Sequence, residues 1–182
     1  HSGVAGTSLF AAEMLTPARI AQARTLPREG EFVEETSLPY GHASTLRSYY
    51  GSGYDRGHLA PNGDMPDKTA QAASFSLANI IPQDQVLNRN LWAWIEHAVR
   101  NDAVRGQGAT YVITGPSYRT APGQQLMRIG GVSGVLVPTA VYKAVYRPGY
   151  GGYAYWAPHN RSGTYDVLSL AQFHTRTGLN LF

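Results

Sequence analysis

Apolar residues recur with a helical period in one long segment, from about Gln83-Asp84 to Val104. They fall three or four positions apart, which places them on one face of an amphipathic helix. These positions are Leu87, Leu91, Trp94, Ile95 and Ala98. Gly106 and Gly108 follow directly and are expected to end the helix, because glycine readily adopts the backbone conformations with which helices stop.

Three later segments have the composition of β-strands. Thr110–Thr114 is a short apolar run closed by Gly115-Pro116, and Gly134–Tyr146 is rich in valine and tyrosine. A turn rich in glycine at 148–152 then leads into Tyr153–Ala157. The last two segments therefore predict an antiparallel hairpin.

Two shorter helices are marked by their first residues. Thr16 and Pro17 fit the N-cap and the first helical position of a helix that reaches about residue 24. Ser169 and Gln172 fit a capping box for a helix over Leu170–Thr177, and a glycine follows as the expected stop.

The order of these elements predicts the fold class. Prolines and glycines punctuate residues 25–57, which predicts loops and short strands there. Strands and helices do not alternate regularly, so we expect an α+β fold, with an antiparallel sheet and flanking helices. The length of 182 residues suits a single domain over residues 1–182, with residues 1–14 as a loose N-terminal arm.

Charge is distributed unevenly along the chain. Fifteen basic and twelve acidic residues give a net charge of +3. Three arginines and five glutamates give the first forty residues a charge of −2, and the rest of the chain carries +5. All but two of the basic residues are arginine, the better bidentate partner of phosphate. A polyanionic partner is therefore a hypothesis, although charge alone is weak evidence for one.

Several classes of function are excluded by what the sequence lacks. Without cysteine there is no disulfide, thiol nucleophile or cysteine-bound metal. No apolar run approaches the roughly 18 residues of a membrane span, so we expect a soluble chain that does not bind a membrane. Phosphate loops, dinucleotide-binding glycine motifs, nucleophile elbows and zincin motifs are also missing. The sequence does not begin with methionine, and its first residues do not form a signal-like segment. His1 is therefore expected to be either a processed or an added terminus.

Two polar clusters are candidates for chemistry. Asp55-Arg56-Gly57-His58 puts an acid, a base and an imidazole next to a flexible glycine, and histidine exchanges protons near neutral pH. On the long helix, Asn88, Trp92 and Glu96 are spaced i, i+4, i+8, and so are expected on one face. Oxygen ligands of this kind suit Mg²⁺. Taken alone, the first cluster also fits a turn, and the second a solvated helix face.

Together the two clusters resemble a known family. The pattern D-R-G-H-x-A-P, followed thirty residues after the histidine by L-N-x-x-x-W-x-x-x-E, is similar to that of the DNA/RNA non-specific endonucleases. These are the endonuclease G-like, sugar-non-specific ββα-metal (His-Me finger) nucleases. Further similar segments, such as Leu77–Gln83 and Thr177-Gly178-Leu179, extend the resemblance over roughly residues 15–182.

The resemblance implies a Mg²⁺-dependent endonuclease that cuts DNA and RNA with little sequence specificity and leaves 5′-phosphate and 3′-hydroxyl ends. A single neutral ligand would hold the metal weakly, so Mn²⁺ or Ca²⁺ is expected to compete and Mn²⁺ to substitute. His58 would be the general base that activates water. Asn88 would be the only direct metal ligand, and Glu96 would hold a metal-bound water. Arg56 would bind the scissile phosphate.

Other residues receive less definite roles. Asp55 is expected to fix the turn, and Asn79 and Gln83 to tie the helix start to the histidine strand by hydrogen bonds. Some members of the family use a further upstream arginine, for which Arg24 and Arg28 are the candidates. Four glutamates lie in the same stretch: Glu29, Glu31, Glu34 and Glu35. This acidic segment is interpreted either as a solvated loop or as a surface that limits or orients DNA binding.

The remaining aromatic and histidine side chains are expected to be structural. Trp92 and Trp94 are predicted to pack the helix, and most tyrosines to pack the sheet. Four histidines share no metal-ligand spacing and are expected to be packed or exposed; they are His42, His97, His159 and His174.

Partners and location complete the expectations. The substrates would be double- and single-stranded DNA and RNA. Alternatives are a non-catalytic nucleic-acid-binding module, or a nuclease toxin controlled by an inhibitor protein; a homodimer is a further possibility. A free nuclease endangers the host genome, so we expect a secreted or periplasmic protein, with a cytoplasmic one as the alternative. The biological role stays open between nutrition, defence, competition and DNA transfer.

Overall fold

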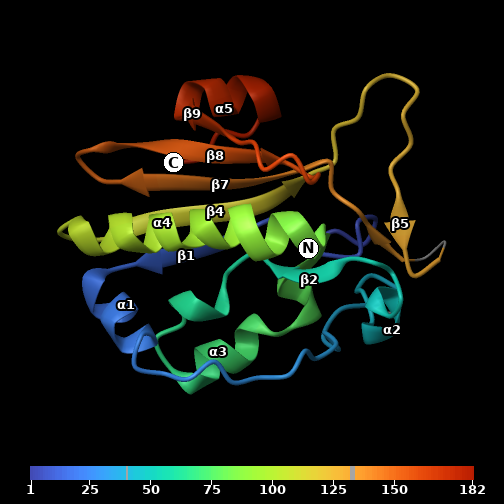
Figure 1. Cartoon of the computed structure of the whole chain (residues 1–182), viewed down its shortest axis with the longest axis horizontal. Helices are drawn as coiled ribbons and strands as arrows, with labels where there is room; N and C mark the ends of the chain where they lie inside the picture. The colour runs from blue at the N-terminus through green and yellow to red at the C-terminus, as the bar shows by residue number, and fades with distance from the viewer. Residues whose placement is uncertain (40, 132–133) are drawn as a thin grey trace.

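The computed structural model describes residues 1–39, 41–131 and 134–182. Its centre is a five-stranded antiparallel sheet in the order β1-β4-β7-β8-β9 (Figure 1). The strands span Ala11–Leu15, Thr110–Ser117, Ala140–Arg147, Gly151–Pro158 and Asp166–Ser169. Strands β7 and β8 form the predicted hairpin. This antiparallel sheet with flanking helices confirms the α+β class.

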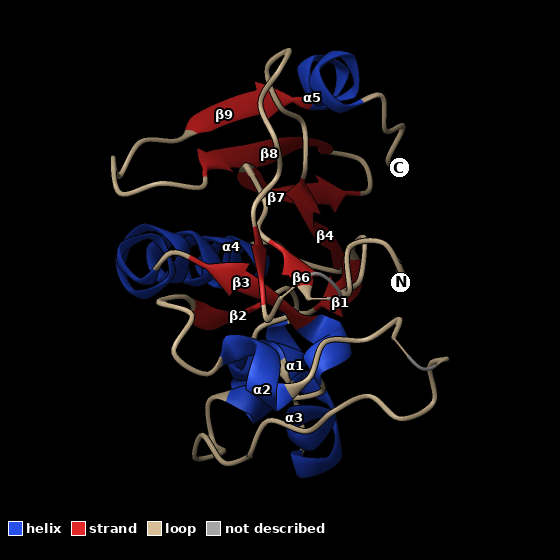
Figure 2. Cartoon of the chain, turned by 90° about the vertical axis from the view of Figure 1, so that its right-hand side faces the viewer, coloured by secondary structure: helices blue, strands red, loops and turns tan. Residues whose placement is uncertain are grey.

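Helices cover both faces of the sheet, as the alternation of side chains along β7 shows. Val141 and Val145 face α4 (Ala93–Arg105), where they share core clusters with Ile95 and Val99. Tyr142 and Ala144, on the opposite face of β7, share a core cluster with Phe173 of α5 (Leu170–Thr177). Figure 2 shows α4 beside the sheet and α5 at the edge formed by β9. Both faces are therefore buried, and α4 is held firmly against the sheet.

The expected loose arm over residues 1–14 is wrong. Residues 11–14 belong to β1, which pairs with β4 from Ala11 opposite Thr114 to Leu15 opposite Thr110. Nearer the terminus, Ala5 is buried and its carbonyl accepts a hydrogen bond from the amide of Leu136, at 3.0 Å. The pairing strand lies about a hundred residues later in the chain, so local pattern does not reveal it.

A second layer carries a two-stranded sheet, β2 (Asp55–His58) with β3 (Ile80–Gln83). A single π-helical turn, η3 (Leu87–Trp92), follows β3 and continues directly into α4. Strand, strand and helix thus meet in the order β-β-α. Below them in Figure 1 lie three short helices: α1 (Pro17–Ala23), α2 (Leu46–Tyr49) and α3 (Lys68–Ser74). The connection from β2 to β3 also contains the 3₁₀ turns η1 (Asn62–Asp64) and η2 (Leu77–Asn79).

The helices that the sequence predicts from their capping residues are confirmed. In α1 the hydroxyl of Thr16 caps the helix and Pro17 opens it, and in α5 the capping box of Ser169 and Gln172 is formed on both sides. Gly178 ends α5 with φ 76°. The long helix begins after Gln83 and ends at Arg105, close to the expected bounds.

Other local predictions need correction. The stretch Gly134–Tyr146 is not one strand: Pro138 separates β6 (Val135–Leu136) from β7, and β6 pairs instead with β5 (Arg128–Ile129). Helix α2 falls in the region expected to hold loops and short strands. That region includes Tyr40, which lies outside the described residues. In the part of the chain that the structure describes, no helix is long and apolar enough to cross a membrane.

Candidate active site

The two polar clusters of the sequence meet in one cavity of about 450 Å³. Its wall combines Arg56 and His58 of β2, Asn88 of η3 and Glu96 of α4. Arg28, from the segment after α1, closes the same cavity. The structure therefore brings together all four residues that the sequence predicts for the site, from elements that are separated along the chain.

His58 lies at the end of β2, with 8% of its surface exposed. The rings of Phe32 and Phe75 lie 5.5 and 5.2 Å from its own. Within the described chain its Nε2 has no hydrogen-bond partner. Burial, and then the positive charge of Arg28, lower the pKa of His58 to about 4. The imidazole is therefore neutral at physiological pH and able to accept a proton.

Asn88 is oriented by Asp55. Its amide nitrogen donates to Oδ2 of Asp55 at 3.0 Å, and the guanidinium of Arg89 donates to both oxygens of the same carboxylate at 2.8 Å. Burial raises the pKa of Asp55, but these hydrogen bonds outweigh it and hold the pKa below its usual range. Asp55 was expected to fix the turn; instead its side chain joins β2 to η3. The bond engages the nitrogen of Asn88, so the carbonyl oxygen is the atom left to serve as a ligand.

Glu96 lies two turns further along the helix and faces the same cavity. Burial is the main reason that the pKa of this carboxyl is raised to about 7. Oε2 of Glu96 lies 3.8 Å from the guanidinium of Arg100, one turn further on. The carboxyl is therefore poised between its two protonation states near neutral pH, where an added cation favours the charged form.

Trp92 does not share the face of Asn88 and Glu96. It is 1% exposed and packs in the core with Leu59 and Ile81, so its predicted packing role is confirmed. The expectation of a shared face is wrong for this residue. The π-helical turn that ends at Trp92 changes the angular step per residue, and the spacing of an ideal α-helix no longer applies there.

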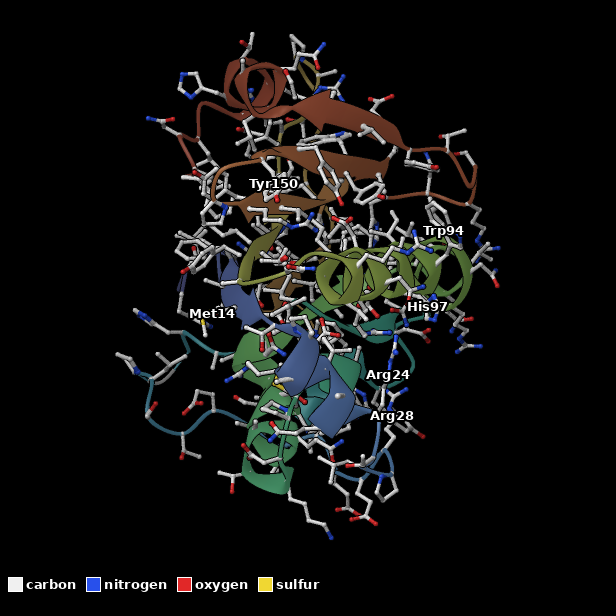
Figure 3. The ribbon with its side chains drawn as sticks, turned by 90° about the vertical axis from the view of Figure 1, so that its left-hand side faces the viewer. Met14, Arg24, Arg28, Trp94, His97 and Tyr150 are labelled. Atoms are coloured by element: carbon white, nitrogen blue, oxygen red, sulfur yellow. The ribbon has the colours of Figure 1, made fainter. Side chains whose placement is uncertain are left out.

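Only one of the two candidate upstream arginines reaches the cavity. Arg28 lines it, whereas Arg24 donates to Oδ1 of Asn101 on α4 at 3.1 Å. Figure 3 shows both side chains on the side of the molecule from which Trp94 and His97 project. The guanidinium of Arg56 lies 4.3 Å from the centre of the Phe32 ring, which fixes it at the cavity wall.

Sequence reasoning missed the charged residues behind the site. Arg100 lines the cavity and is ion-paired with the buried Asp64. Its position four residues after Glu96 is a signal that could have identified it. Deeper still, Lys143 is 1% exposed, and its Nζ lies 4.0 Å from Oε2 of the buried Glu13. Burial is the main reason that the pKa of Glu13 is raised to about 8.

Asn79 and Gln83 differ in how they meet expectation. The side chain of Asn79 accepts from the amide of Ala60 at 3.0 Å and donates to its carbonyl at 2.8 Å, so it ties the turn before β3, and not the helix start, to the segment that follows His58. Gln83 makes no such bond with any described residue. It packs instead against Gly57, where any side chain would clash with it. The glycine before His58 is thus required by the close approach of β3.

The other aromatic and histidine side chains lie outside the cavity. The imidazole of His159 accepts from the amide of Asp84 at 3.0 Å and stacks on Tyr54. Trp94 is half exposed and packs against the rings of Tyr155 and Tyr165. Over residues 1–39, 41–131 and 134–182, no three histidine or acidic side chains gather as a metal-binding group.

The arrangement defines the class of the protein. Two antiparallel strands bring a neutral histidine to a cavity, and the helix that follows brings an asparagine and a glutamate to the same place. This is the arrangement of the ββα-metal nuclease fold.

The chain belongs to the DNA/RNA non-specific endonuclease family, whose family model matches residues 1–182. It is 37% identical over 134 residues to Nuclease C1 of Cunninghamella echinulata var. echinulata, covering 70% of this chain and 53% of the relative. It is 34% identical over 151 residues to human mitochondrial endonuclease G, covering 80% of this chain and 50% of the relative. The chain thus spans about half the length of these curated relatives.

A solved structure agrees with these matches. The EndoG/EndoGI complex, described as showing the mechanism of EndoG inhibition, contains a chain that superposes with a TM-score of 0.86 at 26% identity. The match covers all of this chain and 80% of the other. The fold and the family membership therefore rest on independent comparisons of sequence and of structure.

Proposed function

We propose that the protein is a Mg²⁺-dependent endonuclease that hydrolyses phosphodiester bonds of DNA and RNA with little sequence specificity. The observation that carries the proposal is the convergence of His58, Asn88 and Glu96 with two arginines on one cavity. Membership of the family supports it.

His58 is the general base in this proposal. Its neutral imidazole accepts a proton from the water that attacks phosphorus. A pKa of about 4 leaves the base unprotonated across the physiological range. The rings of Phe32 and Phe75 exclude bulk water from the side of the imidazole that they cover.

The donor set fits a weakly held divalent cation. Asn88 would supply a neutral carbonyl oxygen, oriented by its bond to Asp55, and Glu96 would supply a carboxylate to hold a water of the cation. Bound there, Mg²⁺ would stabilise negative charge on the phosphate and on the departing oxygen. The same oxygen donors accept Mn²⁺, so we expect it to substitute.

Arg28 and Arg56 bind the scissile phosphate in this proposal. Their guanidinium groups line the cavity beside His58 and match phosphate oxygens in pairs. Phosphate contacts carry no sequence information, so double- and single-stranded DNA and RNA are all expected substrates. Breaking the bond between phosphorus and the 3′ oxygen would leave 5′-phosphate and 3′-hydroxyl ends.

Plasmid cleavage tests the proposal against a non-catalytic nucleic-acid-binding module. With Mg²⁺ the protein is expected to nick and linearise supercoiled plasmid and to degrade RNA. Addition of EDTA is expected to abolish both reactions. Salt-sensitive binding without cleavage in Mg²⁺ or Mn²⁺ would favour the binding module, and full activity in EDTA would exclude the metal. End-labelling of the products checks the 5′-phosphate.

An inhibitor protein is a proposed partner. The support for it is that the structural match is to a complex of EndoG with the inhibitor EndoGI. A homodimer and export from the cytoplasm stay predictions of the sequence. The relatives from human and Schizosaccharomyces pombe are named mitochondrial, a location other than the secreted or periplasmic one that the sequence predicts.

A further inference from the structure

A second cavity, of about 470 Å³, adjoins the active-site cavity. Arg28, Arg56 and Asn88 line both, so the two cavities meet where the scissile phosphate is expected. The remaining wall comes from the loop after α1, from α2 and from the segment that leads into β2. Its residues are Phe32, Leu46, Tyr49, Tyr50, Tyr54 and Asp55.

The two cavities differ in chemical character. Polar and charged side chains dominate the first, whereas four aromatic rings line the second: Phe32, Tyr49, Tyr50 and Tyr54. Phe32 and Tyr49 belong to a core cluster or pack against it, so this part of the wall is rigid. Tyr50 lies directly after α2 and is 91% exposed, so most of its ring surface is uncovered.

The one acidic residue in the wall does not oppose an anionic ligand. Asp55 is bonded to the guanidinium of Arg89 and to the amide of Asn88. Two further guanidinium groups, those of Arg28 and Arg56, stand at the junction with the first cavity. One end of the second cavity is therefore positive, and aromatic rings make up most of the remaining wall.

We propose that this second cavity is a subsite for one unpaired nucleobase of the substrate, next to the scissile phosphate. The proposal rests on the proposed nuclease function. A nucleotide combines a flat aromatic base with an anionic phosphate. The aromatic rings of the cavity suit the base, and the guanidinium groups at the junction suit the phosphate. Its volume is that of a small-ligand site and exceeds that of a single base.

A preference among substrates follows. Bases in a duplex are paired and stacked, and one enters such a pocket only after it leaves the stack. Stacking on aromatic side chains tolerates any base, because every base has a π-face. The subsite thus adds affinity for single strands and loops without adding sequence specificity.

Binding measurements with Tyr50 variants test the subsite. The His58→Ala background and the absence of metal together prevent cleavage, so each protein is titrated in that background and in EDTA against three labelled probes. These are a short single strand, an abasic strand of the same length and a covalently closed duplex. Tyr50→Ala is expected to weaken binding of the single strand about tenfold and to leave the other two unchanged. Tyr50→Phe keeps the ring and is expected to bind like the parent.

Tyr150→Ala is the matched control. Tyr150 is 81% exposed in the turn between β7 and β8 and does not line either cavity, so its loss is expected to leave all three affinities unchanged. Equal affinity of Tyr50→Ala and its parent for the single strand would overturn the subsite, as would an equal loss on all three probes. Plasmid cleavage by the wild-type protein is scored separately, so failure of the nuclease proposal is distinguished from failure of the subsite.

Discussion

The amide nitrogen of Asn88 donates a hydrogen bond to Oδ2 of Asp55, with 3.0 Å between the two atoms. The bond links the first residue of β2 to the turn that begins the long helix. The arginine next to Asn88 donates to both oxygens of the same carboxylate. Asp55 thus fixes which atom of Asn88 is free, and the proposed ligand oxygen depends on a residue that does not itself touch the metal.

Asp55→Ala is expected to weaken Mg²⁺ binding about 10- to 100-fold, because the amide of Asn88 loses its orientation. The measurement is the Mg²⁺ concentration that gives half-maximal cleavage. Asp166→Ala is the control, since Asp166 is exposed and is paired with Arg176, at 2.6 Å, away from the active-site cavity. An unchanged Mg²⁺ requirement in Asp55→Ala would show that this carboxylate does not position the ligand.

Arg28→Ala and Arg24→Ala form a matched pair of variants. Arg28 faces the phosphate position beside His58, whereas Arg24 bonds to Asn101 outside the cavity. Loss of Arg28 is expected to lower kcat by about 10²-fold, and loss of Arg24 to have little effect. The pKa of His58, followed by NMR, is expected to rise in Arg28→Ala because a neighbouring positive charge is removed. Equal losses in both variants would contradict this assignment.

The pH dependence of cleavage is expected to report Glu96 rather than His58. Burial raises the pKa of Glu96 to about 7, and the pKa of His58 is lowered to about 4. At low Mg²⁺, activity should therefore fall as pH decreases through about 7, while the imidazole is still neutral. Higher Mg²⁺ favours the carboxylate and should move this acid limb to lower pH. An acid limb that does not respond to Mg²⁺ would assign it to another group.

Glu13 is expected to make stability depend on pH. Its folded pKa of about 8 lies above the ordinary 4.5, so its protonated form adds stability that is complete below pH 4.5. This stability is lost as pH rises through about 8. Glu13→Gln keeps the neutral form, and its free energy of unfolding should exceed that of wild type by on the order of a few kcal/mol at pH 9.

Urea unfolding at pH 5 and pH 9 measures the effect of Glu13→Gln. The two proteins should be close in stability at pH 5 and diverge at pH 9. Glu31→Gln, on the exposed segment after α1, is the control and should follow wild type at both values. A Glu13→Gln variant that loses stability at pH 9 would show instead that the ionised carboxylate is needed beside Lys143.

Features with complete local signals could be predicted from the sequence. The capping residues Thr16 and Ser169 act on amides three positions away, so their helices were located almost to the residue. The spacing of His58, Asn88 and Glu96 identified the family and the cavity wall. Each capping signal and each of the two motifs spans only a few residues, so it can be recognised without knowing the partners that the fold brings to it.

Features that depend on distant contacts could not be predicted. Strand β1 forms by pairing with β4, which lies far along the chain. The sequence of residues 11–15 alone does not indicate this pairing. The sequence gives no indication that Lys143, in a predicted strand, is buried, yet the fold buries it beside Glu13. The second cavity likewise places Phe32, from the loop after α1, in one wall with Tyr49, Tyr50 and Tyr54, and no local pattern indicates that Phe32 joins these tyrosines.

The central claim is that His58 is the base of a nuclease, and the cleavage rate of His58→Ala tests it most directly. In single-turnover cleavage of plasmid with saturating Mg²⁺ at neutral pH, removal of the imidazole is expected to slow the reaction by about 10²- to 10⁴-fold. Mg²⁺ affinity should stay near that of wild type, since His58 is not a proposed ligand. A variant that cuts at the wild-type rate would contradict the account.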